Sequence, residues 1–288
     1  QMALLFSEAT PYIQKYHGKT LVIKYGGNAM INEELKNAVM NDLVTLTLLG
    51  VRVVLVHGGG PEISSMLKRV GKETEFVNGL RVTDEETSEI VQMVLAGKIN
   101  KSLVAKLDNL GGRAMGICGM DGGLIKAQMI DPKLGYVGKI NSVNPQPILD
   151  LLEKGYIPVV STIGCDETGH VYNINADTAA ASIAAAMHAE ALISMTDTVG
   201  LLRDPKDPTS LIRRVDLKGV EELKAEGIIS GGMIPKVECC TNAIRAGVRK
   251  VFIIDGRVPH ALLIETLTDE GAGTMFKKEI EGNYVPKS

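Results

Sequence analysis

Two glycine-rich turns are the residues best suited to chemistry in this sequence. Gly26-Gly27 follows the apolar run Thr20–Tyr25, and Gly58-Gly59-Gly60 follows the run Arg52–His57. Glycine at the end of a strand lets the backbone turn tightly and expose its N–H groups, and a helix that starts there adds the positive end of its dipole. Pro61 suits the first turn of such a helix. The turns predict a cradle for an anion such as phosphate, with tight turns that bind nothing as the alternative.

Two lysines and an arginine accompany these turns. Lys24 stands just before the first turn, and Lys236 lies at the start of an expected helix, after Gly231-Gly232 and Met233. Arg81 precedes a further helix start, where its guanidinium could fork onto a carboxylate. No His or Cys stands in a catalytic pattern, so the set indicates neutralisation of phosphate charge. A surface ion pair for Arg81 and a solvated side chain for Lys236 are the alternatives.

Amide, carboxylate and hydroxyl side chains end other expected strands or begin helices. Asn173, Asn175 and Asp177 run into an alanine-rich helix, and Thr196-Asp197 closes a strand as the edge of a nucleotide pocket would. A helix cap would use the same amides and carboxylate without any ligand. Capping and ligand binding both stay open for them.

Composition and motifs exclude several function classes. The 31 basic and 34 acidic residues give a net charge of −3, so no global positive field attracts nucleic acid or a membrane surface. Gly18-Lys19-Thr20 lacks the preceding glycine of a P-loop, and Gly58-Gly59-Gly60 lacks the GxGxxG spacing of a dinucleotide site. The four cysteines show no metal-binding spacing. With no leader and no membrane-spanning run, we expect a cytoplasmic protein.

Short apolar runs that alternate with helical patterns predict the fold class. The expected buried strands are Thr20–Tyr25, Arg52–His57, Ala114–Cys118, Ile157–Ser161, Ala191–Thr196 and Lys250–Ile254. The expected helices are Glu33–Leu49, Asp84–Leu110, Pro147–Glu153, Asp177–His188 and Lys236–Ala246. This alternation favours a mostly parallel sheet covered by helices, so we expect an α/β protein with two lobes on one continuous sheet.

The first residues form a separate feature. Met2–Tyr16 carries an apolar helical pattern interrupted by Pro11, which predicts a kinked amphipathic helix. Such a helix could pack on its own chain or protrude and grip a neighbouring subunit. Leu202–Ser210, with two prolines, is expected to be an exposed loop.

Six motifs occur in an order that resembles the amino acid kinase family. They are IKYGGNAM, VLVHGGGPEIS, NGLRVTDEET, VLAGKINK, YNINADTAAA and GGMIPKVE, and the resemblance runs from about Tyr12 to Phe276. It implies a three-layer αβα sandwich with a central, mostly parallel sheet. Residues 1–18 would be an N-terminal helix used in oligomerisation, and 19–288 a single kinase domain. Its N-lobe (about 19–180) would bind the acid substrate and its C-lobe (about 181–288) would bind ATP.

The motifs GLRVTD and YNINADTAA are similar to those of family members that phosphorylate N-acetyl-L-glutamate. The resemblance implies phosphoryl transfer from ATP to the side-chain carboxylate, as in arginine biosynthesis, with Mg²⁺ bridging the phosphates of ATP and no protein metal ligand. The catalytic residues it implies are Lys24, Lys236 and Asp177, the last holding both lysines. The implied substrate-binding residues are Gly59, Gly60, Arg81 and Asn173. The implied nucleotide-binding residues are Gly26, Gly27, Thr196, Asp197, Met233 and Lys236.

Arginine-inhibited members of the family resemble this chain at Pro11-Tyr12-Ile13 and in the stretch ALLIETLTDEGAGTMF. By that resemblance an allosteric arginine site would involve Tyr12, Glu265, Gly271 and Gly273, in a hexamer built as a trimer of dimers. A plain dimer is the alternative, and Ala191, where those members usually carry lysine, counts against the arginine site. The signalling protein PII is a further expected partner. Competing functions are phosphorylation of another acceptor (carbamate, glutamate, aspartate or UMP) and a nucleotide or amino-acid sensor without turnover.

Overall fold

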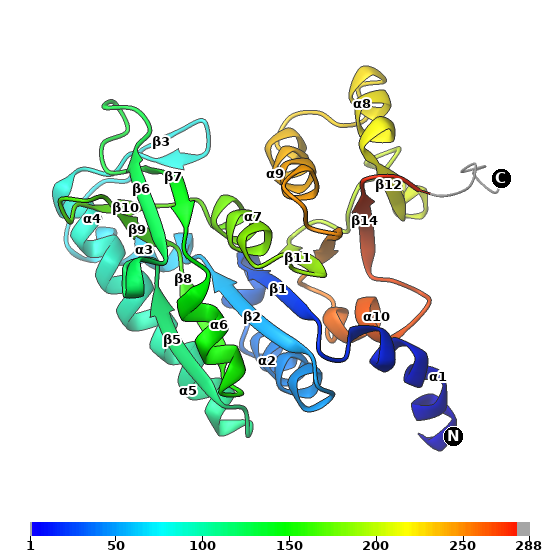
Figure 1. Ribbon diagram of the computed structural model, residues 1–288. Helices are drawn as coiled ribbons and strands as arrows, with labels where there is room; N and C mark the ends of the chain where they lie inside the picture. Colours follow the sequence, from blue (N-terminus) through cyan, green and yellow to red (C-terminus); the bar gives the residue numbers. More distant parts are fainter. Residues whose placement is uncertain (1, 281–288) are drawn as a thin grey trace.

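An eight-stranded sheet forms the centre of the computed structural model, which describes residues 2–280 (Figure 1). Its strand order is β12-β14-β13-β11-β1-β2-β8-β5. The strands are β1 (Thr20–Tyr25), β2 (Arg52–His57), β5 (Ala114–Cys118), β8 (Ile157–Ser161), β11 (Ala191–Thr196), β12 (Arg214–Asp216), β13 (Lys250–Asp255) and β14 (Gly273–Lys277). All neighbours run parallel except β13 and β14. The α/β class and the mostly parallel sheet are confirmed.

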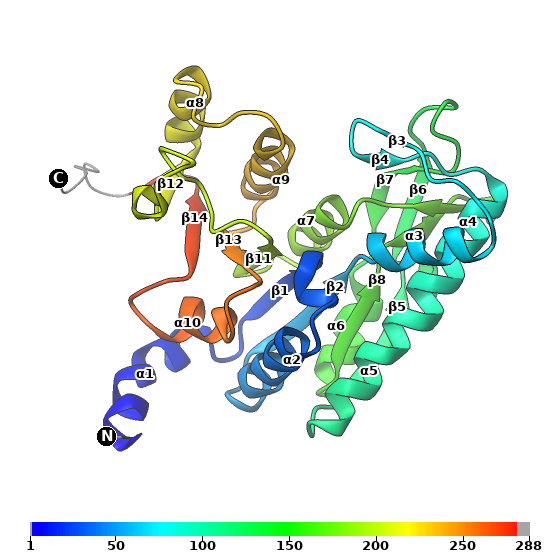
Figure 2. The same cartoon turned by 180° about the vertical axis from the view of Figure 1, so that it is seen from behind.

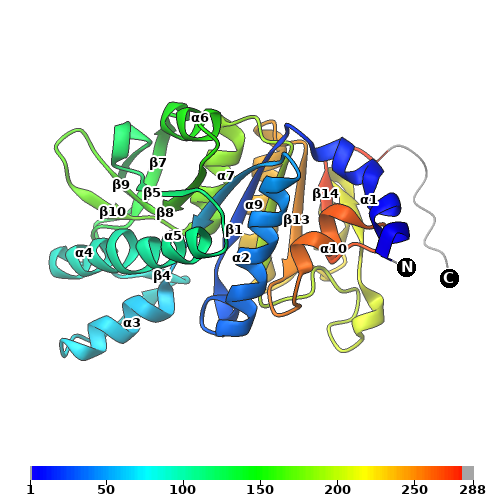
Figure 3. The same cartoon turned by 90° about the horizontal axis from the view of Figure 1, so that it is seen from below.

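The pleat of these strands sends successive side chains to two separate cores. Leu21 and Ile23 of β1 join one core, whereas Val22 joins the other. Helices that contribute to the first core are α2 (Glu33–Leu48), α3 (Gly60–Arg69), α4 (Glu85–Gln92), α5 (Asn100–Asn109) and α10 (Ala261–Leu267). Those of the second core are α6 (Gln146–Glu153), α7 (Ala176–Ala186), α8 (Leu217–Ala225) and α9 (Met233–Arg245). The strands lie between these layers (Figure 3), as expected of an αβα sandwich.

The expectation of one continuous sheet was wrong at the end of the molecule that carries the first half of the chain. A four-stranded sheet there has the order β10-β9-β6-β7, and a hairpin joins β3 to β4. The bounds are β3 (Phe76–Val77), β4 (Leu80–Arg81), β6 (Ile125–Met129), β7 (Gly138–Val143), β9 (Ile163–Cys165) and β10 (Val171–Asn173). These strands are short or interrupted by polar residues, so their sequences lack the continuous apolar runs that mark buried strands.

The helix expected over 84–110 is a continuous helical stretch whose geometry changes inside it. α4 ends at Gln92, residues Met93–Ile99 form a π-helix, and α5 begins at Asn100. A π-helix bonds residue i to residue i+5, a local irregularity that is frequent near functional sites. Short 3₁₀ turns occur at Gly27–Met30, Asp121–Gly123 and Pro208–Ser210. The last of these lies in the loop expected to be exposed, where residues 203–209 are exposed.

The helix α1 (Met2–Tyr16) forms ahead of β1, with Pro11 inside it. Its last turn packs on the same chain, because Tyr16 is buried and α1 contacts α10. The side chains of Ser7 and Glu8 are exposed, and the start of the helix extends away from the sheet (Figure 2). Contact with a neighbouring subunit stays a prediction. Residue 1 and residues 281–288, which belong to the predicted N-terminal segment and C-lobe, lie outside the described residues.

Within residues 2–280, no helix combines the length and apolarity needed to cross a bilayer.

Candidate active site

The candidate site lies where parallel strands of the main sheet end side by side. β1, β2, β11 and β13 bring their carboxyl ends to one edge, because they are parallel neighbours. The first glycine turn follows β1, the second follows β2, and Thr196 closes β11. The topology therefore gathers residues that are up to about 170 positions apart in the chain, since Gly26 and Thr196 end neighbouring strands.

Lys24 and Asp177 form an ion pair at this edge. Lys24 lies opposite Ser194 in the β1–β11 ladder, and its side chain leaves the sheet on the α7 face, as that of Val22 does. Lys24 Nζ lies 3.1 Å from Asp177 Oδ1, and the Ser194 hydroxyl donates to the same oxygen at 3.1 Å. Asp177 stands in the first turn of α7, where the N-cap Asn175 accepts a hydrogen bond from the Asp177 N–H. Asn175 is therefore a helix cap that fixes the position of Asp177.

Lys236 shares a small cavity, called the lysine cavity below, with that ion pair. The cavity is lined by Lys24, Asp177, Ala180, Leu192, Ser194, Lys236, Cys239, Cys240 and Ile253. No carboxylate in the described part of the chain lies within ion-pair distance of Lys236, so Asp177 pairs with Lys24 alone. Two ammonium groups beside one carboxylate leave a net positive charge in the cavity. That charge favours an anionic ligand.

The start of α9 adds to this positive potential. Gly232 occupies the N-cap position without a side-chain cap, and Met233 and Lys236 stand in the first turn. The first N–H groups of a helix lack intrahelical partners and carry the positive end of the dipole. The N–H groups of Met233 and Ile234 already donate to Ser230 O and Gly231 O, at 3.1 and 3.2 Å, and Pro235 has no N–H. An anion at this helix start would therefore be stabilised by the helix dipole and by Lys236.

The first glycine turn packs against the end of β11. Gly27 has a φ of +73°, in the left-handed region, and a Cβ there would lie 2.7 Å from Asp197 Oδ1. A Cβ on Gly26 would lie 3.3 Å from Lys24 Nζ. Thr196, which precedes Asp197, is buried. The turn therefore needs bare backbone at Gly27, both for its conformation and for the space next to Asp197.

A second cavity, of about 180 Å³, lies beside the second glycine turn. All four residues predicted to bind the acid substrate line it: Gly59, Gly60, Arg81 and Asn173. Leu95, Val137 and Ile174 supply apolar walls. A Cβ on Gly59 would lie 2.1 Å from Ile99 Cδ1, so a side chain there would displace Ile99. The sequence placed these residues in one site, and the structure brings them together.

Arg81 is a buried cation without an acidic partner among the residues described. Its side chain donates to Gly60 O at 3.0 Å, to Ser64 Oγ at 3.0 Å and to Thr74 Oγ1 at 3.3 Å. The Phe76 ring lies 4.7 Å from the guanidinium carbon, a cation–π contact. Burial lowers the pKa of Arg81. The surface ion pair that the sequence left open is therefore wrong, and a buried guanidinium in a cavity favours a carboxylate ligand.

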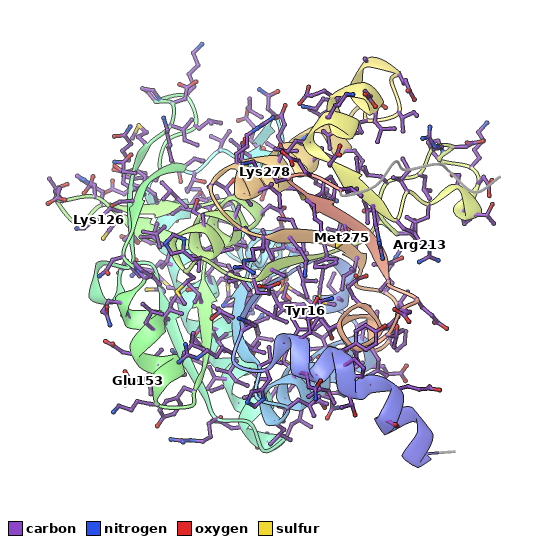
Figure 4. All side chains as sticks on the ribbon, turned by 45° about the vertical axis from the view of Figure 1, so that its right-hand side comes forward. Tyr16, Lys126, Glu153, Arg213, Met275 and Lys278 are labelled. Atoms are coloured by element: carbon purple, nitrogen blue, oxygen red, sulfur yellow. The ribbon has the colours of Figure 1, made fainter. Side chains whose placement is uncertain are left out.

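A third cavity, of about 300 Å³, lies between α1, α10 and the end of the sheet. Tyr12, Glu265, Gly271 and Gly273, the residues predicted for an arginine site, all line it. Tyr16 of α1, Arg213 before β12 and Met275 of β14 also line it and are labelled in Figure 4. Phe252 of β13 lines this cavity, whereas the next residue, Ile253, lines the lysine cavity.

The charges of the third cavity are mixed. Burial raises the pKa of the Glu265 carboxyl, an effect that the N–H groups of Ala272 and Gly273 oppose. A hydrogen bond with Asp269 raises the pKa of Tyr12. Basic side chains line the same space: Lys15, Arg213, Arg214, Lys250 and Lys277. A ligand in this cavity would lie near both carboxylates and cations. An amino acid suits such a site because it carries a carboxylate and an ammonium group of its own.

Ser64, Thr74 and Cys239 lie in these sites without having been selected from the sequence. Ser64 follows the second turn inside α3, and Thr74 precedes the β3–β4 hairpin. Isolated hydroxyls carry no spacing signal, so only the fold reveals that both hold Arg81. Cys239 is half-buried in α9, three residues after Lys236, and that helical spacing was its one signal.

Known proteins resemble this chain over nearly its whole length. The sequence model of the amino acid kinase family matches residues 19–255. An acetylglutamate kinase of Brachyspira hyodysenteriae is 56% identical over 279 residues, covering 96% of this chain and 97% of that protein. Among solved structures, N-acetylglutamate synthase from Neisseria gonorrhoeae, complexed with coenzyme A and N-acetyl-glutamate, gives a TM-score of 0.85 at 27% identity and covers 97% of this chain and 64% of that one. The same synthase complexed with coenzyme A and L-arginine gives a TM-score of 0.80 at 25% identity and covers 97% of this chain and 66% of that one.

Proposed function

The chain belongs to the amino acid kinase family, and on that premise we propose that it transfers the γ-phosphoryl group of ATP to the side-chain carboxylate of N-acetyl-L-glutamate. The product is N-acetyl-L-glutamyl 5-phosphate, an acyl phosphate of arginine biosynthesis. The acetylglutamate kinase that is 56% identical supports this substrate. The observation that carries the proposal is the cavity shared by Lys24, Lys236 and Asp177, over β1, β11 and β13.

The reaction needs charge neutralisation and no general base. A glutamate side chain has a pKa of about 4.3, so the acceptor is already ionised at neutral pH. The barrier is the approach of this anion to the anionic triphosphate. Lys24 and Lys236 are placed to stabilise the transferring phosphoryl group, and Asp177 holds Lys24 in position at 3.1 Å. Fixed positive groups of this kind lower the barrier because they need no reorganisation during the reaction.

The acid substrate occupies the cavity of Arg81 in this proposal. The Arg81 guanidinium binds a carboxylate, the Asn173 amide binds a polar group, and the N–H groups of Gly59 and Gly60 bind the reacting carboxylate. The apolar walls at Leu95 and Val137 suit the acetyl methyl group. All these residues precede position 180, which supports the proposed acid-binding N-lobe of about 19–180.

The nucleotide occupies the other side of the lysine cavity. Gly26, Gly27, Thr196, Asp197, Met233 and Lys236 are the proposed contacts, four of them in the proposed C-lobe of about 181–288. When bound, Mg²⁺ would neutralise charge on the phosphates of ATP. Two lysines line the lysine cavity, together with a single carboxylate, that of Asp177. Such a donor set fits a metal held by the triphosphate, since ammonium groups cannot ligate Mg²⁺.

Trapping of the acyl phosphate tests the proposal. The purified chain, ATP and Mg²⁺ are incubated with hydroxylamine and one acceptor at a time, and the hydroxamate formed is measured. We expect hydroxamate with N-acetyl-L-glutamate, and none with carbamate, glutamate or aspartate; UMP is tested by ADP release. A different preferred acceptor would identify another kinase of the family. Nucleotide binding without any product would identify a sensor.

We also propose that L-arginine binds in the α1–α10 cavity and inhibits the enzyme. The contacts would be Tyr12, Glu265, Gly271 and Gly273. The mixed charges of the cavity support this ligand, as does the structural relative complexed with L-arginine. An arginine titration of activity, in the full chain and in the Glu265→Gln variant, tests it. Inhibition that is equal in both would contradict the assignment.

The oligomer proposed is a hexamer formed as a trimer of dimers through α1. The exposed side chains of Ser7 and Glu8 support this proposal, as does the backbone of α1, which extends away from the main sheet (Figure 2). Mass in solution with and without residues 1–16 tests it, and a dimer that does not change on truncation would contradict it.

We further propose that the protein is cytoplasmic and that the PII signalling protein is a partner. Co-elution of the chain with purified PII tests the partnership.

A further inference from the structure

His57 is a buried imidazole that the proposed phosphoryl transfer does not use. It ends β2 directly before Gly58, and its side chain is 0% exposed. Its Nδ1 lies 3.0 Å from Gly58 O, and its Nε2 lies 3.1 Å from Asn100 Nδ2. Asn100 is also 0% exposed. Two polar side chains buried this deeply are costly unless each is hydrogen-bonded, so the arrangement calls for a role.

The surroundings of Asn100 fix which way its amide points. Asn100 Nδ2 lies 2.9 Å from Val159 O and 3.3 Å from Ile117 O, while its Oδ1 accepts from Lys101 Nζ at 3.1 Å. Turning the amide over would set Oδ1 against two carbonyl oxygens and the NH₂ group against an ammonium. The donor Nδ2 therefore faces His57.

This orientation selects one form of the imidazole. Nε2 of His57 faces a donor and must offer its lone pair, whereas Nδ1 faces the Gly58 carbonyl and must carry the hydrogen. A charged ring would set two N–H donors against each other. Burial, with a smaller contribution from the ammonium of Lys101, lowers the pKa of His57 to about 4, although the hydrogen bond to the Gly58 carbonyl opposes this shift. His57 is therefore neutral, with its proton on Nδ1, at physiological pH.

The hydrogen bond to Gly58 O orients the next peptide N–H. In a planar trans peptide the C=O and the N–H point in opposite directions, and the carbonyl of Gly58 shares its peptide plane with the N–H of Gly59. Fixing Gly58 O on the His57 side of the sheet turns the Gly59 N–H away from that side. Gly59 lines the cavity in which the acid substrate is proposed to bind. The imidazole thus sets the direction of a donor that the proposed acceptor needs.

Side chains of the π-helix also pack against this glycine turn. Ile99 Cδ1 and Leu95 Cδ2 would lie 2.1 Å and 2.8 Å from a Cβ on Gly59, so both side chains press on the backbone there. Asn100 follows the π-helix directly and begins α5. The π-helix therefore supplies the apolar support of Gly59, and the residue that follows it supplies the hydrogen bond that holds His57.

We propose that His57 is a positioning residue: held in one tautomer by Asn100, it fixes the Gly58–Gly60 turn so that the Gly59 N–H meets the anionic acceptor. This inference rests on the proposed function and adds to it a residue that lies on the opposite face of the sheet from Lys24. Misplacement of a reacting group by about 1 Å can cost about 100-fold in rate, so the device matters although His57 touches no reactant.

Kinetics of three variants test the proposal. We expect His57→Leu to lower kcat/KM for N-acetyl-L-glutamate by about 10- to 100-fold, with the KM for ATP changed less than about twofold. His57→Gln, which keeps an acceptor for Asn100, should recover part of that loss. His188→Asn, at an exposed position whose left-handed backbone asparagine tolerates, is the control. Wild-type kinetics in His57→Leu, or equal losses for both substrates without recovery in His57→Gln, would overturn the proposal.

The tautomer is measured without any turnover. The chain has five histidines, so ¹⁵N-histidine labelling with His57→Gln assigns the His57 signal. We expect a neutral ring protonated at Nδ1 across about pH 5.5–8. In Asn100→Asp a carboxylate would face Nε2, so the ring should gain a second proton and titrate at higher pH. A wild-type ring that titrates near pH 6.5, or carries its proton on Nε2, would overturn the inference. If the wild-type enzyme does not phosphorylate acetylglutamate, the proposed function fails, and this spectrum alone decides the role of His57.

Discussion

Gly27 and Asp197 meet so closely that a Cβ on Gly27 would lie 2.7 Å from the carboxylate oxygen Oδ1. The contact joins the turn after β1 to the end of β11, across the sheet edge where the nucleotide is proposed to bind. Since Gly27 also has a φ of +73°, a side chain there meets both backbone strain and the carboxylate of Asp197, one of which must shift. The relationship therefore makes the geometry of the turn depend on the absence of a single methyl group.

Replacing Gly27 by alanine should weaken ATP binding. We expect Gly27→Ala to raise the KM for ATP at least about tenfold, because Asp197 or the turn must move. Gly71→Ala is the matched control: Gly71 has a φ of +76° but nothing within 4 Å of the added Cβ. Both variants carry the cost of a left-handed alanine, about 1–2 kcal/mol. Equal kinetics in the two variants would show that contact with Asp197 is irrelevant.

The paired lysines should dominate kcat. We expect Lys24→Ala and Lys236→Ala each to lower kcat by about 10²–10³-fold, as is typical when one fixed electrostatic donor is removed. Steady-state rates at saturating ATP and acetylglutamate measure this. Lys206→Ala, in the exposed loop, serves as the control. Turnover near the wild-type rate in Lys24→Ala would contradict the assignment.

Arg81 should act chiefly on the acid substrate. We expect Arg81→Ala to raise the KM for N-acetyl-L-glutamate by at least about tenfold, while kcat falls less, because a charged hydrogen bond is worth about 1.5–3 kcal/mol. Arg81→Lys should not rescue binding, since lysine lacks the planar fork. Ser64→Ala, which removes one of the hydroxyls that hold Arg81 at 3.0 Å, should give a smaller rise. An unchanged KM in Arg81→Ala would place the acid elsewhere.

Asp84 should stabilise the fold in a pH-dependent way. Contact with Lys72 and hydrogen bonds from Thr87 lower the pKa of Asp84 to about 2, from the usual 3.8. A carboxyl with a lower pKa in the folded state binds protons more tightly when unfolded. Its stabilisation is therefore present above the unfolded pKa and is lost as the pH falls toward 2.

Urea unfolding of Asp84→Asn measures this contribution. The variant keeps an oxygen to cap α4 but loses the charge that Lys72 meets at 2.7 Å. We expect a lower unfolding free energy than wild type at pH 7, with a difference that shrinks between pH 5 and pH 3. Glu85→Gln, on the same exposed turn, should show no such difference. A constant difference across this range would contradict the assignment of Asp84.

The long buried elements were predictable because their signals are local. Apolar runs such as Arg52–His57 match observed strands to the residue, and Lys250–Ile254 is extended by one residue to Asp255. The four-stranded sheet was missed, because Ile163–Cys165 and Val171–Asn173 are only 3 residues long and polar residues interrupt the other two strands. The π-helix at Met93–Ile99 was also invisible, since it replaces an α-helix without a change of composition.

The candidate site was predictable in its cations and glycines and unpredictable in its supports. Lys24 and Lys236 were selected because glycine turns precede or follow them, and they share a cavity. The hydroxyls that hold Arg81 and the amide that holds His57 depend on tertiary contacts over tens of residues, for which no spacing rule exists. The single pairing of Asp177 with Lys24 likewise required coordinates.

Adjacent residues of β13 line different cavities. Phe252 borders the α1–α10 cavity, and Ile253, on the opposite face of the strand, borders the cavity of the two lysines. An effector seated beside Phe252 would be screened from the reactants by the thickness of one strand layer. Because the two cavities lie on opposite faces of β13, effector and substrate would not compete for the same space. The effector would act on the reactants through a shift of β13. Inhibition through that route would be mechanical, and raising the substrate concentration would not displace the effector by contact.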